Sequence, residues 1–251
     1  MNKNEIQFIL NDKLIKINNL NTNITVLKYL REIKKLNGTK EGCASGDCGA
    51  CTAVVVEIDN NKLNYKSINT CIMFLYALHG KQLITVENLN NNKLHPVQQS
   101  MVDNHGSQCG FCTPGFIMAM FSMYKNKIRP TNDNIDEHLA GNLCRCTGYN
   151  SIKKAAKKMY TYVKKDKFSN NENKIIKLLK SIHSSDVLIK NNNYKFYIPS
   201  NLRNLINYTK SDTNYKYVTG GTDLALEVTK KNYDINSLIY LGNNEDLNYI
   251  N

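Results

Sequence analysis

The chain has 251 residues, of which 41% are apolar, so a packed core is expected and wholesale disorder is excluded. Its formal net charge is +12, from 33 Lys and Arg against 21 Asp and Glu. The excess is spread out apart from a dense stretch at 153–167, which we interpret as a solvated helix face. No basic patch is interleaved with aromatic residues, so nucleic-acid binding is not favoured.

The chain has no signal-peptide core at its N-terminus and no window with the roughly 18 apolar residues that span a bilayer. We therefore expect a cytoplasmic protein without membrane contact. Thiols stay reduced in that compartment, so the eight cysteines are expected to be ligands and not disulfides.

Strand and loop patterns alternate over the first part of the chain. Residues 5–17 predict a hairpin, and 24–36 carry apolar residues at helical spacing, with Gly38 at a C-cap position. A loop rich in Gly and Cys covers 42–51. Further strands are predicted at 52–58, 62–68 and 82–86. We expect a small α+β domain over residues 1–90.

After residue 90, apolar residues recur at helical spacing. The pattern covers four segments, 96–105, 114–126, 131–140 and 150–164. Pro96 and Pro114 fit the first turns of two of them, and Thr131 fits an N-cap. An all-α domain with four helices is therefore predicted over residues 91–165.

The last third reads as a linker followed by a new domain. Residues 166–193 are polar, with one short helix expected at Lys174–Ile182. From 194 to 251 we predict a strand, a helix at 201–209 and a strand that runs into Gly220-Gly221, without an obvious closing element.

The first cysteine group has the C-x4-C-x2-C…C spacing that plant-type ferredoxins use to bind one 2Fe–2S cluster. Its members are Cys43, Cys48, Cys51 and Cys71. Gly42, Gly46 and Gly49 lie between the ligands, as expected of a backbone that must wrap an anionic cluster. A structural zinc site is the alternative, but zinc favours paired C-x2-C knuckles and only one occurs here. The α+β domain is therefore predicted to be ferredoxin-like (β-grasp).

The second cysteine group lies in the helical domain as a C-x2-C and a C-x-C pair. Its members are Cys109, Cys112, Cys144 and Cys146. The C-x-C pair strains a tetrahedral zinc site and suits a binuclear iron site. Each group supplies the four thiolates of one 2Fe–2S cluster and no cysteine remains, so we predict two clusters that pass single electrons.

Three longer segments carry a family resemblance: EGCASGDCGACTAVVV (41–56), HPVQQSMVDNHGSQCGFCTPGF (95–116) and GNLCRCTGY (141–149). They resemble the iron–sulfur portion of the molybdenum hydroxylases, which include xanthine dehydrogenase, aldehyde oxidase and carbon monoxide dehydrogenase. The resemblance implies that the first cysteine group lies nearer a flavin and the second nearer a molybdenum cofactor on a large partner subunit. It also implies that Gln108 and Cys146 lie against the pterin of that cofactor.

The segment at 196–231 resembles the start of the family's α/β FAD-binding domain. Its strand would aim backbone N–H groups at a pyrophosphate from the Gly-Gly-Thr-Asp turn. The resemblance implies FAD contacts from Lys216, Tyr217, Val218, Thr219, Gly220, Gly221, Thr222, Asp223 and Leu224. Since only about the first fifty residues of such a domain are present, we expect it to be truncated at 194–251.

This domain order is most similar to the small subunit of bacterial xanthine dehydrogenase. That family implies oxidation of hypoxanthine or xanthine on the partner subunit, with electrons passing through both clusters to FAD and then NAD. No catalytic acid or base is expected in this chain. The alternatives are the iron–sulfur subunit of an aldehyde or carbon monoxide dehydrogenase relative, or a stand-alone 2Fe–2S electron carrier without flavin.

Two short departures from the family pattern occur. Asn150-Ser151 stands where the family usually has Arg-Pro after Gly-Tyr, and Asn88 stands where it often has Gly. Neither position carries a predicted ligand.

Overall fold

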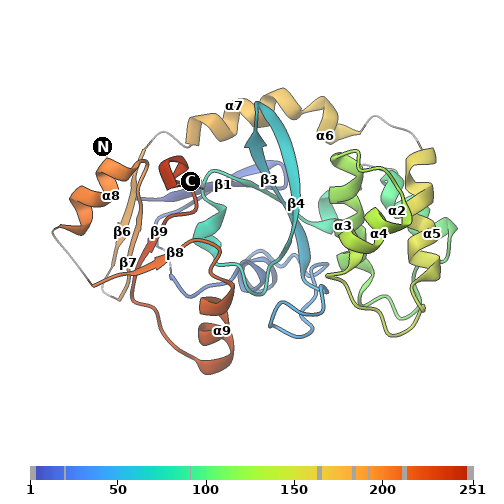
Figure 1. The fold of residues 1–251 in the computed structure, drawn as a ribbon, viewed down its shortest axis with the longest axis horizontal. Helices are drawn as coiled ribbons and strands as arrows, with labels where there is room; N and C mark the ends of the chain where they lie inside the picture. Colours follow the sequence, from blue (N-terminus) through green and yellow to red (C-terminus); the bar gives the residue numbers. More distant parts are fainter. Residues whose placement is uncertain are drawn as a thin grey trace.

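The computed structural model describes residues 4–19, 21–90, 92–162, 166–182, 185–191, 193–210 and 214–247. A five-stranded sheet lies in the middle of the molecule (Figure 1). A group of helices lies on one side of it, and a four-stranded sheet lies on the other. The fold is mixed α and β, as the sequence predicts.

The central sheet is built from the first part of the chain. Its strands are β1 (Ile6–Leu10), β2 (Lys13–Ile17), β3 (Thr52–Asp59), β4 (Lys62–Asn69) and β5 (Gln82–Ile84). Their order is β2-β1-β5-β3-β4, with β1 parallel to β5 and the other neighbours antiparallel. The predicted hairpin and the later strands are confirmed. Short 3-10 turns follow β4 and β5, at Leu75–Leu78 and Val86–Asn88.

The helix predicted at 24–36 is shorter than expected. It consists of α1 (Val26–Lys28) and one π-helical turn (Tyr29–Ile33). The chain leaves the helix at Lys35, which has φ +57°, so the predicted C-cap at Gly38 is wrong. Gly38 instead donates its N–H to Glu87 Oε1 at 2.8 Å, and a Cβ at Gly38 would overlap Val86. Close approach between two segments therefore explains this glycine.

The four predicted helices are confirmed. They are α2 (Pro96–Asp103), α3 (Thr113–Lys125), α4 (Asn132–Leu139) and α5 (Asn150–Lys158), and a 3-10 turn at Met159–Thr161 extends α5. Pro96 begins α2, and the Thr131 side chain caps α4. Residues 163 and 164, which end the predicted helix at 150–164, lie outside the described residues. No described helix combines the length and apolar character that a membrane crossing needs.

Helix α3 fixes the helical group to the central sheet. Every residue from Gly115 to Tyr124 is buried, which is typical of a helix enclosed on all sides. Phe116 and Phe121 share a core with Val54 and Val56 of β3. The first cysteine loop leads into β3 and the loop of Cys109 and Cys112 leads into α3, so both loops lie at the same end of this packing.

The segment predicted as a linker, 166–193, contains more structure than expected. It forms α6 (Lys167–Asn170), α7 (Glu172–Ile182) and a strand, β6 (Val187–Lys190). Helix α7 lies across β3 and β4 and connects the helical group to the second sheet (Figure 1). Ile175 and Leu179 pack on Ile9, so α7 is held by apolar contact. The alternating burial of Val187 and Ile189 explains the strand.

The final segment forms a second sheet with two helical crossovers. Its elements are β7 (Lys195–Ile198), α8 (Leu202–Thr209), β8 (Lys216–Val218), α9 (Thr222–Lys231), β9 (Ser237–Tyr240) and a 3-10 turn at Glu245–Leu247. The strand order is β6-β7-β9-β8, and β9 pairs in parallel with both β7 and β8. The expectation of no closing element is therefore wrong, because β9 lies inside this sheet.

The two sheets share one hydrophobic core. Phe8, Leu75 and Tyr76 belong to the same buried cluster as Val187 and Phe196. The Tyr76 ring lies 4.8 Å from the Phe196 ring and 5.3 Å from the Phe74 ring, measured between centroids. The second sheet is thus packed firmly against the ferredoxin-like part.

Candidate iron–sulfur centres

All eight cysteines are free thiols, and they gather in the two groups that the spacing predicts. In the first group, the backbone N–H of Cys43 donates to Cys48 Sγ at 3.4 Å, and the Cys71 thiol donates to the Cys51 sulfur. Cys43 also interacts electrostatically with Cys51 and Cys71. The loop at 42–51 and the start of the turn after β4 therefore bring four sulfurs together.

Backbone N–H groups are aimed at one of these sulfurs. Ser45, Asp47 and Cys48 each donate a backbone hydrogen bond to Cys43 Sγ, at 3.4, 3.3 and 3.4 Å. Ala44 and Gly46 have φ of +53° and +83°, which turns these N–H groups inward. A concave set of N–H donors stabilises negative charge on sulfur, as a thiolate-ligated cluster requires.

Hydrogen bonding shifts the pKa values of this group. Burial raises the pKa of Cys43, but hydrogen bonds from Ser45 and Cys48 outweigh it and lower that pKa to about 6. The hydrogen bond from Cys71 lowers the pKa of Cys51, and the same bond raises the pKa of Cys71. Thiolate is the ligand form of cysteine, so Cys43 and Cys51 are prepared to bind metal.

The second group joins two separate loops of the helical part. The Cys112 thiol donates to the Cys144 sulfur, and the Cys146 thiol donates to Cys109. The C-x2-C segment before α3 therefore faces the C-x-C segment before α5. Gly110 and Gly148, with φ of +86° and +61°, turn the chain beside these ligands.

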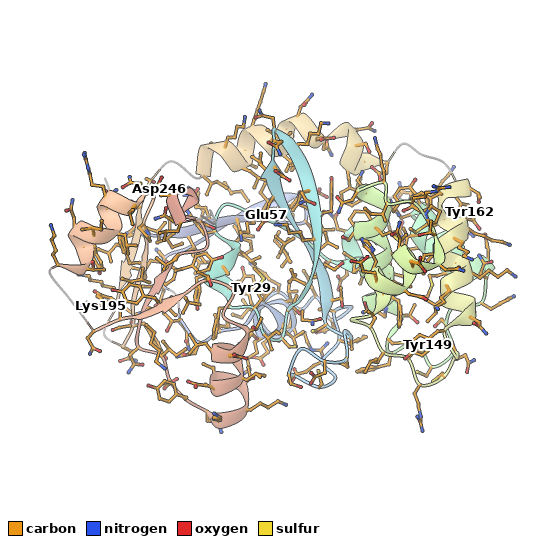
Figure 2. The ribbon with its side chains drawn as sticks, in the orientation of Figure 1. Tyr29, Glu57, Tyr149, Tyr162, Lys195 and Asp246 are labelled. Carbon is orange, nitrogen blue, oxygen red and sulfur yellow. The ribbon has the colours of Figure 1, made fainter. Side chains whose placement is uncertain are left out.

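In the second group, hydrogen bonds stabilise the thiolate form of Cys144. Burial raises its pKa, but hydrogen bonds from the Thr147 hydroxyl and backbone lower it to about 7. The Cys144 N–H donates to the Tyr149 hydroxyl at 3.0 Å. Tyr149, labelled in Figure 2, adopts a left-handed conformation with φ +67° just before α5. It thereby ties the ligand loop to the helix that follows it.

Within the described residues, no three His, Cys, Asp or Glu side chains are arranged around a single metal position. A 2Fe–2S cluster needs no such set, because each of its two irons takes two protein thiolates. The thiol pairs of both groups suit that binuclear arrangement.

The glycine turn predicted to bind FAD begins helix α9. Gly221 has φ +75° at the N-cap and is partly buried, whereas Gly220 is exposed and has no neighbour within 4 Å of a built Cβ. Because Gly220, Thr222 and Asp223 are exposed, a phosphate can reach the N–H groups of this helix start. Thr222 and Asp223 follow in its first turn, and Leu224 packs against the shared core.

The strand before this turn carries the other residues that the resemblance implies for FAD contact. The Val218 side chain is buried, and its carbonyl accepts a hydrogen bond from the Leu241 N–H. Tyr217 is exposed, and Lys216 forms an ion pair with Glu227 at 3.6 Å. Thr219 lies in the bend between strand and helix.

Helix α9 also contacts the first cysteine loop, which the sequence does not predict. Lys230 Nζ donates to the Cys43 carbonyl at 2.7 Å, and the Thr229 hydroxyl donates to the Ala44 carbonyl at 3.4 Å. At the other end of the helix, Gly221 lies beside the Phe74 ring. The predicted flavin segment and the first cysteine group are thus neighbours.

The residues implied to contact a pterin lie on an exposed part of the second group. Gln108, Cys109 and Cys146 are all exposed, as is the apolar side chain of Phe111. The second cysteine group is therefore accessible from outside, whereas Cys51 and Cys71 of the first group are buried.

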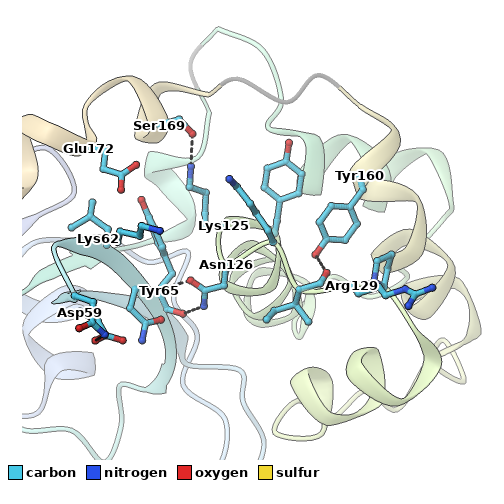
Figure 3. A pocket seen from close by; sticks show the side chains of 16 residues that line it. Asp59, Lys62, Tyr65, Lys125, Asn126, Arg129, Tyr160, Ser169 and Glu172 are labelled. Carbon is cyan, nitrogen blue, oxygen red and sulfur yellow. Dashed lines mark hydrogen bonds between the residues drawn. The ribbon is translucent and has the colours of Figure 1, made fainter.

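One large cavity is lined by residues outside both cysteine groups. It measures about 1280 Å³ and lies between the turn that joins β3 to β4, the end of α3 and the start of α7 (Figure 3). Tyr65, Tyr124 and Lys125 are among its lining residues, and none of the described lining residues is a cysteine.

Comparison with known proteins agrees with this geometry. Residues 8–76 match the "2Fe-2S iron-sulfur cluster binding domain" family, and residues 85–157 match the "[2Fe-2S] binding domain" family. A quinoline 2-oxidoreductase structure from Pseudomonas putida 86 is 31% identical with a TM-score of 0.53, covering 61% of this chain and 90% of that one. The chain belongs to the molybdenum hydroxylase family. Its membership rests on residues 8–157, and residues 194–251 lie outside both family matches.

Longer relatives of this molybdenum hydroxylase chain include xanthine dehydrogenase of Emericella nidulans, 47% identical over 154 residues, which are 60% of this chain and 11% of the relative. Aldehyde oxidase 3 of Mus musculus is 41% identical over 157 residues, which are 61% of this chain and 12% of the relative. The aldehyde oxidoreductase structure from Desulfovibrio gigas is 27% identical with a TM-score of 0.56, over 62% of this chain and 16% of that one. The chain thus spans about a tenth of the length of these curated relatives.

Proposed function

We propose that this chain is the electron-transfer component of a molybdenum hydroxylase and binds two 2Fe–2S clusters. Cys43, Cys48, Cys51 and Cys71 hold one cluster, and Cys109, Cys112, Cys144 and Cys146 hold the other. The observation that carries the proposal is the convergence of two four-thiol groups, one of them with three backbone N–H groups aimed at Cys43 Sγ. When bound, the clusters supply one-electron carriers, while the chain's residues hold them, exclude water and set their charge environment.

The exposure of the two groups supports a direction for the electrons. The second group, with Gln108 and Cys146, is open to a partner subunit that carries a molybdenum cofactor. The first group contacts helix α9, whose N-terminus is open to the pyrophosphate of FAD. Electrons would therefore enter through the helical part and leave through the ferredoxin-like part towards FAD and then NAD.

The substrate lies on the partner subunit in this proposal, so this chain's residues do not select it. Named relatives include xanthine dehydrogenases and aldehyde oxidases, and we favour a purine such as hypoxanthine or xanthine. An aldehyde or carbon monoxide dehydrogenase relative uses the same electron path with another substrate subunit.

Metal analysis of the purified chain tests the clusters directly. Iron and acid-labile sulfide should each approach about four per chain, and dithionite should produce two distinct 2Fe–2S signals by electron paramagnetic resonance (EPR). Bound zinc without sulfide would refute the iron–sulfur assignment.

Co-expression tests the place of the chain in a larger enzyme. The chain is expressed with a molybdopterin-binding subunit from the same genome, and the complex is examined for flavin absorbance and NAD reduction. Capture of that subunit through the exposed second group supports the proposal. A chain that holds both clusters but recruits neither subunit nor flavin is a stand-alone electron carrier.

A further inference from the structure

The two cysteine loops meet backbone to backbone. The N–H of Leu143 donates to the carbonyl oxygen of Cys48 at 3.0 Å. Cys48 belongs to the first cysteine group, and Leu143 directly precedes Cys144 of the second. One hydrogen bond therefore completes an otherwise covalent path between a ligand of one group and a ligand of the other.

Asn142 holds this contact from the side. Its side chain is only 5% exposed, and Nδ2 donates to the Gly49 carbonyl at 2.9 Å and to Thr52 Oγ1 at 3.0 Å. Gly49 follows Cys48, and Asn142 precedes Leu143. The amide clamp and the backbone hydrogen bond thus join consecutive residues of both loops, which fixes their register.

The surrounding backbone leaves no room for side chains. A Cβ at Gly49 would overlap the Gly141 carbonyl and Asn142, and Gly49 also has φ +68°. A Cβ at Gly115 of α3 would overlap the Gly49 carbonyl. Three segments therefore approach at backbone distance where the two groups are joined.

Cohesion of the two parts does not require this contact. At the far end of α3, Asn126 forms hydrogen bonds to both the N–H and the carbonyl of Tyr65, at 3.1 and 2.7 Å, and so clamps the same two layers. The Leu143 side chain is 55% exposed, so apolar burial does not hold this residue in place. Leu143 contributes to this contact through its backbone N–H and not through its side chain.

We propose that the Leu143 N–H and the Asn142 amide are positioning groups for electron transfer between the two clusters. The inference rests on the proposed function, since it requires a cluster in each group. With a cluster bound in each group, one electron would pass from the cluster at Cys144, which is thereby oxidised, to the cluster at Cys48, which is thereby reduced. No bond forms or breaks, and the proton stays on the Leu143 nitrogen.

The backbone donor is tested by a pair of substitutions in the full-length chain. Leu143→Pro removes the N–H, whereas Leu143→Ala shortens the exposed side chain and keeps it. EPR of the doubly reduced protein measures magnetic coupling between clusters, and pulsed one-electron reduction measures how fast the electron redistributes. Leu143→Pro should lose the exchange part of the coupling and slow redistribution, and Leu143→Ala should match the original chain.

The amide clamp is tested by Asn142→Ala, with Asn126→Ala as the matched control because it removes an amide between the same two layers. Asn142→Ala should weaken the exchange coupling and slow redistribution, while Asn126→Ala leaves both unchanged. If Asn142→Ala and Leu143→Pro both keep about four irons per chain and leave the coupling and the rate unchanged, this inference is overturned and the proposed function is not. Absence of one cluster from the unsubstituted chain would instead overturn the proposed function.

Discussion

Lys230 brings a positive charge to the first cysteine loop, 2.7 Å from the carbonyl oxygen of a ligand residue. A cation favours the reduced form of a cluster, which carries one more negative charge. Because Lys230 is exposed, the effect is that of a surface pair, about 0.2–1 kcal/mol, or about 10–40 mV for a one-electron couple. Lys230→Met should lower the potential of the first cluster by that amount at low salt, measured by EPR-monitored titration.

Lys231→Met is the control for this substitution, since it removes the same charge from the adjacent position of α9. An equal fall in both variants would show a general field effect and contradict a specific contact at Cys43.

Each cysteine group should lose its own cluster independently of the other. Cys71→Ala removes a buried thiol of the first group, so iron and sulfide should fall to about two per chain while the signal of the second cluster persists. Cys146→Ala should give the reverse result. Iron that stays near four in either variant would show that the altered residue is not a ligand.

At this scale the cysteines are predictable from the sequence, because their spacing is local. The contacts of Asn142 are not, since its partners Gly49 and Thr52 lie 93 and 90 residues away. In the sequence, only the position of Asn142 within the cysteine motif at 141–149 indicates that it could matter. Nothing in the sequence distinguishes Lys230 from the many other lysines.

At the scale of elements, helix α3 packs against the first cysteine loop, and the close contact is at Gly115. An alanine there would favour the helix by up to about 1 kcal/mol, but its Cβ would overlap the Gly49 backbone, and overpacking costs about 1–3 kcal/mol. The steric cost exceeds the gain in helix propensity. Gly115→Ala should therefore speed the loss of cluster absorbance on heating.

Gly141→Ala is a matched control, since nothing lies within 4 Å of its built Cβ. It should bleach at the rate of the unsubstituted chain. Faster bleaching of both variants to the same extent would show that the overlap at Gly49 is not the cause.

Helix α6 is fixed to the helical group by buried charges. Asp166 Oδ1 lies 2.9 Å from Lys125 Nζ, Asp166 Oδ2 lies 3.2 Å from His95 Nε2, and all three side chains are at most 7% exposed. Burial raises the pKa of Asp166, but hydrogen bonds from His95 and Lys125 outweigh it and hold that pKa well below its usual range. Removing one partner of such a buried set costs about 3–5 kcal/mol.

Asp166→Ala should therefore speed amide hydrogen exchange in Lys167–Asn170. Since the folded state lowers the pKa, its stabilising effect is complete above the unfolded value of about 3.9 and is lost as pH falls below it. The difference between Asp166→Ala and the unsubstituted chain should shrink below about pH 4. Asp136→Ala, which breaks the exposed ion pair with Lys153, should have little effect on exchange in its own helix.

Apolar patterns predicted most of the elements, but two short strands were missed. Strands β6 and β9 have four residues each, flanked by Asn-rich turns, so their pattern is too brief to separate from a linker. Pairing with β7 stabilises both, and that pairing is not visible in the local sequence. The π-helical turn at Tyr29–Ile33 likewise carries no distinct local pattern.

For the whole molecule, the second sheet covers an apolar face of the ferredoxin-like part. A chain that ends after Ile182 keeps both cysteine groups and α7 but lacks the residues that cover Leu75 and Tyr76. It should retain about four irons per chain, yet bind hydrophobic dyes and associate in size-exclusion chromatography. A monodisperse, dye-negative product would contradict this shared core.

The order of parts along the chain was predictable because each part has its own cysteine spacing or glycine turn. The packing of these parts against one another was not predictable from the sequence. The predicted linker suggested loosely connected parts, whereas α7 and the shared core join them through apolar contacts between residues more than a hundred positions apart.

The aromatic stack around Tyr76 has a mechanical consequence. Its ring meets Phe74 on one side and Phe196 and Tyr240 of the second sheet on the other, and it is fully buried. Any swing of the second sheet would separate these rings and expose them to water, at a cost of about 1.5–3 kcal/mol for each large apolar side chain. The second sheet is therefore fixed to the ferredoxin-like part and does not move as a separate domain. In the proposed electron path, the distance between the first cluster and a flavin bound at α9 would then be constant, and the transfer rate would depend on that distance and not on the frequency of a domain motion.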